Sequence, residues 1–465
     1  MPDTNDIATL SAGELAAAYR ARTLSPVEAA QALLARLDAL QPTLNAFCVV
    51  DRDGALMAAR AAEGRWQRGA ALGPLDGVPV TIKDLVSMRG FPTRRGSHLT
   101  EPAPDGEDGP AVARLREAGA VILGKTTTPE FGWKAIGDSP LTGITRNPWN
   151  LDRTPGGSSA GAAAACAAGI APLHVGSDGA GSIRIPSAFT GIFGLKATFG
   201  RVPAHPPSPM GLLSNVGPMT RHVRDAAAML DVLAQPDVRD PYGLPPHDRD
   251  WLDGIEDGAK GLRIAYSPDL GYATVDPEIA AACAAAARQF EALGAHVEEV
   301  GAIFPSPRET LLTLWSAGTA RLLAGFPPQK QALCDPGLIE SARRGTGVSG
   351  ADYVGADLAR TTLGATMMAF HQRYDLLLTP MMPVPALPVG QDLSDPARET
   401  HWIDWSPFSY PFNMTRQPAC SVPCGLTSAG LPVGLQIVGP LYREGLVLRA
   451  ARAFETTQPA RRPPL

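Results

Sequence analysis

The chain has 465 residues, of which 45% are hydrophobic and 19% are charged. This is the composition of a globular protein with one large core or two to three domains. A formal charge of −5, without a basic cluster, argues against nucleic-acid binding. No apolar run reaches the ~18–20 residues of a membrane span, and the N-terminal segment lacks the pattern of a signal peptide. We therefore expect a cytoplasmic protein that binds neither nucleic acid nor membrane.

The six cysteines are scattered along the chain. None forms a CxxC pair, and none lies near a histidine at the spacing of metal ligands. Free cysteine is among the most buried residue types, so we interpret these thiols as structural residues of a protein in a reducing compartment. The sequence indicates no metal and no cofactor.

The N-terminal region, residues 1–60, predicts helices. Two stretches, SAGE at 11–14 and SPVE at 25–28, begin with serine and carry glutamate three residues later. This is the capping box that starts a helix, and Pro26 suits the first helical position.

Strands and helices then alternate through a core region, residues 70–235. The stretch VPVTIKDL predicts a strand over 78–85, with Val80 and Ile82 on one face and Thr81 and Lys83 on the other. The elements expected after it are a helix at 112–119, a strand at 120–124, an Ala-rich segment, a strand at 172–176 and a helix that begins near Ser182.

Residues 236–375 form a more helical region, which begins with a Pro-, Asp- and Gly-rich surface connection at 235–260. Its expected elements are a strand–helix–strand unit, with the helix at 277–293, and a long helix at 351–374. The last part of the chain, 376–465, returns to the core sheet, with buried strands at 374–380 and 431–439. Strands alternating with helices indicate an α/β fold on a mixed sheet.

Two motif matches fail on their context. Gly119–Thr126 fits the phosphate-binding pattern GxxxxGK[ST], but its four variable residues form a strand rather than a loop of exposed amides. Gly157–Gly161 fits the G-x-S-x-G elbow, but polar turn residues precede it where an apolar strand is required. His174, His205 and His222 are available as triad partners, yet each is more typical of a surface or satisfied histidine.

Three other features are compatible with one catalytic site. Lys83 lies in an apolar strand, where desolvation would lower its pKa and allow it to act as a base. The alternative is a lysine that reaches solvent from a strand edge. Gly156–Ser159 precedes an Ala-rich run, and alanine is the residue with the highest helix propensity. The stretch is therefore predicted to be a helix start rather than a linker.

The third feature is the glycine-rich turn GSDGAGS, residues 176–182. Successive amides there could converge on one point and stabilise an oxyanion. An ordinary helix cap is the alternative interpretation. The amides concerned belong to Gly179, Ala180, Gly181 and Ser182.

The runs TPGGSSAGAAAA and GSDGAGSIRIPSAFTGIFGLKATFGRVP resemble the signature of the amidase signature family. GPLDGVPVTIKDL, LGKTTTPEFGW and PFNMTRQPACSVPCGLTSAGLPVGLQIVG resemble further family segments, so the resemblance covers nearly the whole chain. It implies a single domain over 1–465, with a mixed sheet flanked by helices on both faces, and an amidohydrolase that cleaves C–N bonds of carboxamides, with aryl-amides, esters or carbamates as possible substrates.

The resemblance also implies the site residues. The Ser–cis-Ser–Lys triad of the family falls on Ser182 as nucleophile, Ser158 as proton relay and Lys83 as base. The oxyanion-binding amides fall on the turn at 179–182, and the carbonyl of Gly132 falls on a substrate-lining position. Asp178 and Arg184 flank the nucleophile as supporting residues.

This sequence departs from the family pattern at Ala160 and Ala180, where glycine is more frequent. Ala180 would be strained by ~1 kcal/mol if its φ were positive. Ala197 replaces a usual proline, with little expected effect on the chemistry.

We expect a small amide-type substrate, no cofactor, and a monomer or homodimer without an obligatory partner. An amidotransferase subunit that passes ammonia to a partner is the alternative, although RVPAHPPSPMGLL (201–213) is more like free amidases. A catalytically silent binding protein is a third possibility. The side chains that suggest an aryl preference are Trp133, Met210, Trp405, Phe408 and Tyr410.

Overall fold

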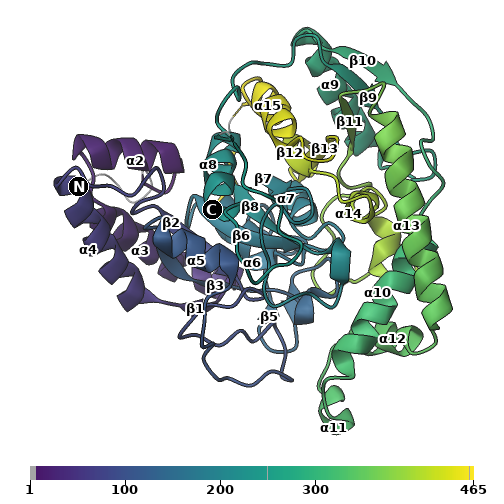
Figure 1. Cartoon of the computed structure of the whole chain (residues 1–465), viewed down its shortest axis with the longest axis horizontal. Helices are drawn as coiled ribbons and strands as arrows, with labels where there is room; N and C mark the ends of the chain where they lie inside the picture. The colour runs from purple at the N-terminus through teal and green to yellow at the C-terminus, as the bar shows by residue number, and fades with distance from the viewer. Residues whose placement is uncertain (1–6, 249, 460) are drawn as a thin grey trace.

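The computed structural model describes residues 7–248, 250–459 and 461–465, and it is built around one sheet of eleven strands (Figure 1). The spatial order of the strands is β1-β3-β2-β6-β8-β7-β12-β13-β11-β9-β10. β2 pairs in parallel with β3 and β6, and β9 pairs in parallel with β10 and β11. The other neighbours in the sheet are antiparallel, so the predicted mixed sheet is confirmed.

The strands of this sheet are short. Their bounds are β1 Phe47–Val50, β2 Pro79–Lys83, β3 Val121–Thr126, β6 Leu173–Asp178, β7 Phe193–Lys196, β8 Asn215–Thr220, β9 Arg263–Tyr266, β10 His296–Glu299, β11 Leu376–Pro380, β12 Ala419–Leu426 and β13 Pro432–Val438. β4 (Asp138–Ser139) and β5 (Gly143–Ile144) form a separate hairpin.

The helices fall into three groups by their place in the fold. The first group is α2 Ala12–Ala21, α3 Pro26–Leu44, α4 Arg52–Gln67 and α5 Pro110–Glu117. The second is α6 Ala160–Ala167, α7 Arg184–Thr190, α8 Val223–Leu233, α9 Pro277–Ala292 and α15 Glu444–Glu455. The third is α10 Arg308–Leu323, α11 Pro328–Gln331, α12 Pro336–Gly345, α13 Gly350–Phe370 and α14 Pro411–Met414.

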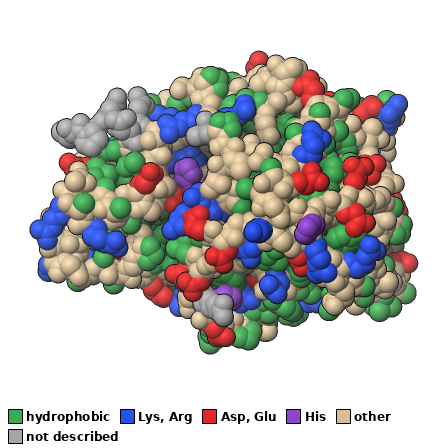
Figure 2. All heavy atoms as spheres, turned by 90° about the horizontal axis from the view of Figure 1, so that it is seen from above, with side chains coloured by type: hydrophobic (Ala, Val, Ile, Leu, Met, Phe, Trp, Pro, Cys, Tyr) green, Lys and Arg blue, Asp and Glu red, His purple; other side chains and the backbone are tan. Residues whose placement is uncertain are grey.

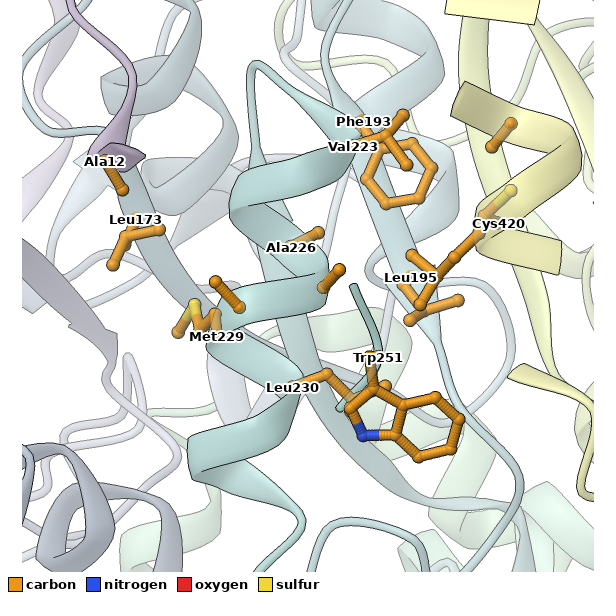
Figure 3. Close-up of a cluster of buried hydrophobic side chains, with 14 of the residues drawn as sticks. Ala12, Leu173, Phe193, Leu195, Val223, Ala226, Met229, Leu230, Trp251 and Cys420 are labelled. Atoms are coloured by element: carbon orange, nitrogen blue, oxygen red, sulfur yellow. The ribbon is translucent and has the colours of Figure 1, made fainter. Parts of the chain in front are cut away.

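Helices cover both faces of the sheet, as predicted. α8, α9 and α15 pack on one face, where Figure 3 shows Ala226, Met229 and Leu230 of α8 beside Leu173 of β6 and Leu195 of β7. α6 and α7 pack on the other face, beneath which Ala162, Cys166 and Ile183 form a small cluster. Buried polar side chains meet where β2 and β6 end and α7 begins, at Lys83, Asp178 and Arg184.

The helices α10–α13, which we call the helical cover (residues 308–370), lie at one side of the molecule (Figure 1). α10 packs against α12 and α13, and α13 packs against α14. A second hydrophobic core joins the cover to the α7 side of the sheet through residues such as Ala180, Phe189, Trp315 and Leu363. The cover therefore rests on the segment that carries the predicted nucleophile.

Most predicted elements lie within a few residues of their observed bounds. Both predicted capping boxes are present, and no helix or strand interrupts residues 235–260 in the described part of this connection. The prediction that region 1–60 holds helices alone is wrong at β1, because four apolar residues are too few to show a period; its residues 1–6 lie outside the described chain. β8 was not predicted because NVGPMT carries glycine and proline, which disfavour strands.

No helix among the described residues is both long and apolar enough to cross a bilayer. Positive and negative side chains are interspersed over the face seen in Figure 2. Within the described ranges, no group of three or more His, Cys, Asp or Glu side chains is arranged to hold a metal ion.

Leu435 tests the sheet centre, because it is fully buried on β13, between β12 and β11. Leu435→Ala should lower the free energy of unfolding by about 2–5 kcal/mol, since a central cavity cannot fully collapse. Leu358→Ala is the matched control: its side chain is 63% exposed, and the change should stay within about 0.5 kcal/mol. Urea unfolding followed by tryptophan fluorescence measures both, and equal midpoints for the two variants would contradict the assignment.

Candidate active site

Lys83, at the end of β2, is a fully buried lysine with polar contacts on the α6 side of the sheet. Its Nζ lies 2.7 Å from Ser158 Oγ, 2.9 Å from Ser177 Oγ and 3.4 Å from the Ser177 carbonyl oxygen. Val80 and Ile82 point into the opposite core, as the alternation predicts. The alternative of a lysine that reaches solvent is wrong for this residue.

The electrostatic state of Lys83 follows from this burial. Desolvation lowers its pKa well below the usual value of 10.5, and the negative charge of Asp178 only partly opposes that shift. In the described chain, no carboxylate lies within ion-pair distance of its Nζ. A lysine in this setting loses its proton at a lower pH than an exposed lysine does.

Ser158 follows a cis peptide bond from Gly157. Glycine is the only residue type that fits at position 157, because a Cβ atom there would lie 2.6 Å from the carbonyl oxygen of Ile136. The helix α6 begins at Ala160, so the stretch is a helix start and not a linker. The hydroxyl of Ser159 does not cap this helix; it donates to the Ser177 carbonyl at 3.1 Å and accepts from the Ser177 amide at 3.2 Å.

The turn from Gly179 to Ile183 is shaped by one carboxylate. Asp178, the last residue of β6, accepts the amides of Gly181 at 2.7 Å and Ile183 at 3.2 Å. This wraps the chain around the carboxylate and delivers Ser182, which is 5% exposed, just before α7.

Arg184 completes this arrangement from the first position of α7. Its Nε and a terminal nitrogen each donate to Asp178 at 3.0 Å, and both side chains are fully buried. Burial alone would raise the pKa of Asp178, but the charge and hydrogen bonds of Arg184 hold that pKa well below its usual 3.8. The carboxylate is therefore ionised whenever the protein is folded near neutral pH.

Three residues from the C-terminal part of the chain hold Arg184 in turn. Its guanidinium donates to the Ser409 carbonyl at 2.9 Å, Gln436 Oε1 at 2.7 Å and Asn413 Oδ1 at 2.6 Å. Asn413 also donates to both the carbonyl and the carboxylate of Asp178. The sequence analysis did not find these residues, because no local pattern marks a buried polar side chain as a partner of a residue more than 200 positions away.

Three of the four predicted oxyanion amides are unoccupied by the described chain. The amide of Gly181 donates to Asp178, whereas those of Gly179, Ala180 and Ser182 meet no acceptor among the described residues. Ala180 is not among the described residues with positive φ, so replacing glycine costs no backbone strain there.

The predicted triad is assembled in part. Lys83 and Ser158 are hydrogen bonded, and the amide of Ser159 donates to the carbonyl of Ser182 at 3.1 Å, which brings the two serine segments together. No hydrogen bond joins the hydroxyls of Ser158 and Ser182 within the described chain. Catalytic hydrogen bonds often tighten only when substrate is bound.

Gly132 lies directly beside Ser158. Its φ is +71°, and a Cβ atom there would lie 3.0 Å from Ser158 Oγ and 2.8 Å from Leu85. The preceding residue, Phe131, also has a positive φ of 51°, which is uncommon outside glycine. The buried Glu130 holds this turn by accepting from Ser97 Oγ at 2.5 Å and from the Asp335 amide at 2.6 Å.

Lys134 connects this turn to the helical cover. The buried ammonium contacts three carboxylates: Asp138 at 2.6 Å, Asp335 at 2.7 Å and Asp392 at 3.0 Å. Desolvation opposes the charge of Lys134, but the three carboxylates outweigh it and raise its pKa above 10.5. The pKa values of Lys83 and Lys134 thus shift in opposite directions, because in the described chain only Lys134 has carboxylates within ion-pair distance.

A row of aromatic rings stands beside the oxyanion turn. Trp133, His401, Trp402 and Trp315 are in successive ring contact, and a Cβ atom on Gly179 would lie 3.3 Å from the Trp315 ring. The row closes this side of the turn to water. Trp133 was predicted to border the pocket, whereas Trp315 and Trp402 were not, because no local pattern shows which aromatic rings contact one another.

A cavity extends from Ser177, beside Lys83, along the proline-rich loop at 203–211. Of the five side chains predicted to favour aryl groups, Met210 lines this cavity. Trp405, Phe408 and Tyr410 are almost fully buried in the second core, and Trp405 stacks on Phe189. Phe131 and Phe199 provide the aromatic wall instead.

Lys125 of the rejected phosphate-binding pattern and His174, a rejected triad partner, have structural roles. Lys125 of the GKT stretch is inside β3 and pairs with the buried Asp84 at 2.9 Å, so no phosphate-binding loop exists there. His174 is fully buried between Thr81 Oγ1 and the Ala171 carbonyl, and burial lowers its pKa to about 3. A neutral, fully bonded histidine on the sheet is a structural residue.

Asp178→Asn tests whether this carboxylate builds the turn. The change leaves Arg184 as an unpaired buried cation, so the free energy of unfolding should fall by about 3–5 kcal/mol. Asp38→Asn is the matched control, because Asp38 pairs with Arg52 at the surface and the change should cost no more than about 1 kcal/mol. Denaturant unfolding measures both, and equal losses would contradict the role given to Asp178.

The comparisons with known proteins place the chain in a family. A sequence model of the family described as Amidase matches residues 28–448. The acylamidase of Rhodococcus erythropolis is 41% identical over 462 residues, which cover 97% of this chain and 96% of that protein. A glutamyl-tRNA(Gln) amidotransferase subunit from Myxococcus xanthus is 36% identical over 475 residues, which cover 95% of this chain and 96% of that protein.

Among solved structures, a bacterial aryl acylamidase of the amidase signature family superimposes with a TM-score of 0.91. It is 32% identical, and the superposition covers 97% of this chain and 96% of that one. The fold, the extent of the match and the motifs around Lys83, Ser158 and Ser182 lead to the same conclusion: the chain belongs to the amidase signature family.

Proposed function

We propose that this protein hydrolyses small carboxamides through an acyl-enzyme on Ser182, with Ser158 as proton relay and Lys83 as base. The observation that carries the proposal is the pairing of a fully buried lysine, lacking a carboxylate partner, with a serine hydroxyl at 2.7 Å. A neutral amine can accept a proton from that hydroxyl, whereas an ammonium could only donate.

The contacts of Lys83 match the hydrogens of both its charge states. Lys83 Nζ lies within hydrogen-bond distance of three oxygens and donates to Ser158 Oγ, Ser177 Oγ and the Ser177 carbonyl. In the neutral form that we propose, two N–H groups keep the Ser177 oxygens as acceptors and the lone pair takes the place of the donor toward Ser158. After protonation, all three N–H groups have the same three oxygens as acceptors. Ser177 therefore supports the base in both states without rearrangement.

In the acylation step, Ser182 Oγ attacks the amide carbon while its proton passes to Ser158 Oγ, whose own proton passes to Lys83 Nζ. The carbonyl oxygen becomes negative and takes hydrogen bonds from the unoccupied amides of Gly179, Ala180 and Ser182. One such donor is typically worth about 3–4 kcal/mol of barrier.

The tetrahedral intermediate then collapses. The C–N bond breaks, and the leaving nitrogen takes a proton from Ser158, which is resupplied by Lys83. Water adds to the resulting ester by the same relay in reverse, releasing the carboxylic acid and restoring Ser182 and the neutral lysine. Asp178 and Arg184 keep the turn in place throughout and exchange no proton.

Two groups of relatives bear on the substrate. The acylamidase and the aryl acylamidase support a stand-alone enzyme acting on small amides. The amidotransferase relative, at 36% identity, supports a glutaminase that delivers ammonia to a partner. We favour the stand-alone enzyme, because the stretch after the nucleophile, RVPAHPPSPMGLL, is more like that of free amidases, and part of it lines the cavity. Strong glutaminase activity that appears only with a partner protein would reverse this preference.

Fluorophosphonate labelling tests the nucleophile and the base together. Intact-mass analysis and peptide mapping should find one adduct, on Ser182, in the wild-type protein. Lys83→Met and Ser158→Ala should each slow both labelling and anilide hydrolysis by at least about 100-fold, because the proton of Ser182 then has no acceptor. Lys330→Met, an exposed lysine of the cover, is the control and should label at the wild-type rate. Labelling on Ser159 instead would contradict the assignment.

The pH dependence of kcat/KM reports the charge state of Lys83. The neutral form is the active one, so kcat/KM should rise as pH increases through the lowered pKa of Lys83 and fall below it. Ser177→Ala removes an acceptor that favours the ammonium, which lowers the pKa of Lys83 further and moves the rising limb to lower pH. Ser214→Ala, in the same cavity but without contact to Lys83, should leave the limb unchanged. An upward shift in Ser177→Ala would contradict the model of a neutral base.

A further inference from the structure

The cavity beside the triad has an arginine at its far end. Its inner part runs from Ser177, the contact of Lys83, to Arg95, and an outer hollow begins on the other side of Arg95. Phe131 and Leu322 line both parts, so these three residues form the junction between them.

Arg95 differs from the other arginines of the chain. It is half-buried, and among the described arginines that are not exposed it is the one whose guanidinium makes no hydrogen bond, ion pair or ring contact. Its neighbour Arg94 shows the contrast, since Arg94 Nε donates to Thr100 Oγ1 at 3.2 Å. As a lining residue of both cavities, Arg95 has N–H donors without a protein acceptor in the described chain, and these can bind an anion.

The acidic residues near the junction are already engaged. Glu101 pairs with Lys330 at 2.8 Å, and Asp105 accepts from Thr93 Oγ1 at 2.5 Å and from the Met88 amide. Asp240, on the inner cavity, accepts the amides of Ala204 and Tyr242. None of the three lies within ion-pair distance of Arg95 in the described structure.

The backbone fixes Arg95 relative to the catalytic turn. Its carbonyl accepts the Phe131 amide at 2.7 Å, and both residues have positive φ, 54° and 51°. A Cβ atom on Gly96 would lie 2.5 Å from the Thr128 carbonyl, so the two turns are in close contact. Because Gly132 follows Phe131 and touches Ser158, Arg95 is held at a set position relative to the reacting atoms.

The walls between the two ends are mainly apolar. Leu85, Phe131, Val202, Pro209 and Met210 line the inner cavity. A dry cavity of about 150 Å³ is enough to hold benzene, and this one measures about 160 Å³. It therefore fits a short alkyl or phenyl spacer.

From this arrangement we infer that Arg95 binds a carboxylate carried by the substrate, so that the enzyme prefers amides whose scissile group is joined to a carboxylate by a short apolar spacer. The guanidinium offers paired N–H donors that match a carboxylate. This inference rests on the proposed amide hydrolysis and specifies the substrate class of the same site.

Matched anilides test the inference. Succinyl p-nitroanilide and butyryl p-nitroanilide differ by a carboxylate on the acyl side, and 4-acetamidobenzoate and 4-acetamidotoluene differ by one on the amine side. In the wild-type enzyme, kcat/KM should favour the anionic member of at least one pair. Arg95→Gln should reduce kcat/KM for that member by about 10- to 100-fold, through an increase in KM, and should change kcat/KM for the neutral member by no more than about 2-fold. Arg95→Lys should restore part of the lost kcat/KM.

Arg94→Gln is the control, since its side chain does not line either cavity, and it should keep the wild-type preference. A second readout separates binding from chemistry: calorimetric binding of the same anilides to Ser182→Ala, with and without Arg95→Gln. Arg95-dependent binding of the anionic member without turnover by the wild type would contradict the proposed hydrolysis but support the carboxylate site. Turnover of both members at equal rates, or a preference that survives Arg95→Gln, would overturn the inference.

Discussion

The ion pair between Asp178 and Arg184 is the constraint on which the rest of the site depends. Two charges buried in a protein interior are costly unless each is paired and hydrogen bonded, and here every oxygen and nearly every donor is engaged. The carboxylate organises the turn that carries Ser182, and the arginine ties that turn to β13 and α14. A charge pair that is a poor source of stability thus fixes the backbone of the turn between β6 and α7.

Burial acts on the two lysines of the site in opposite ways. Lys83 is surrounded by hydroxyl and carbonyl oxygens, so desolvation is the larger effect and lowers its pKa. Lys134 is nearly as buried, but three carboxylates keep it charged and make it a link between the Gly132 turn and the helical cover. Two buried lysines therefore have opposite pKa shifts, and the difference between them is the presence of carboxylates around Lys134.

Local patterns predicted the parts of the site that depend on neighbours in sequence. The alternation in VPVTIKDL placed Lys83 opposite Val80, and the glycine-rich turns marked Ser158 and Ser182; the roles of these residues came from the family resemblance. Sequence could not reveal that Asp178 occupies the Gly181 amide, nor that Asn413 and Gln436 hold Arg184, because these depend on packing between distant segments. The prediction that Trp405 and Phe408 border the pocket was wrong for the same reason: their residue types are common in pockets, but both side chains lie in the second core.

The strand order has a consequence for how the protein is made. β1–β3 and β6–β8 form one half of the sheet, β9–β11 form the other, and only β12 and β13 lie between them. A ribosome completes both halves before it synthesises the two strands that join them. Asn413 and Gln436, which hold Arg184, also come from this late segment. The unfinished chain thus carries Lys83, Ser158 and Ser182 without the side chains that hold Arg184, and the two halves become one sheet only when the β12–β13 hairpin inserts.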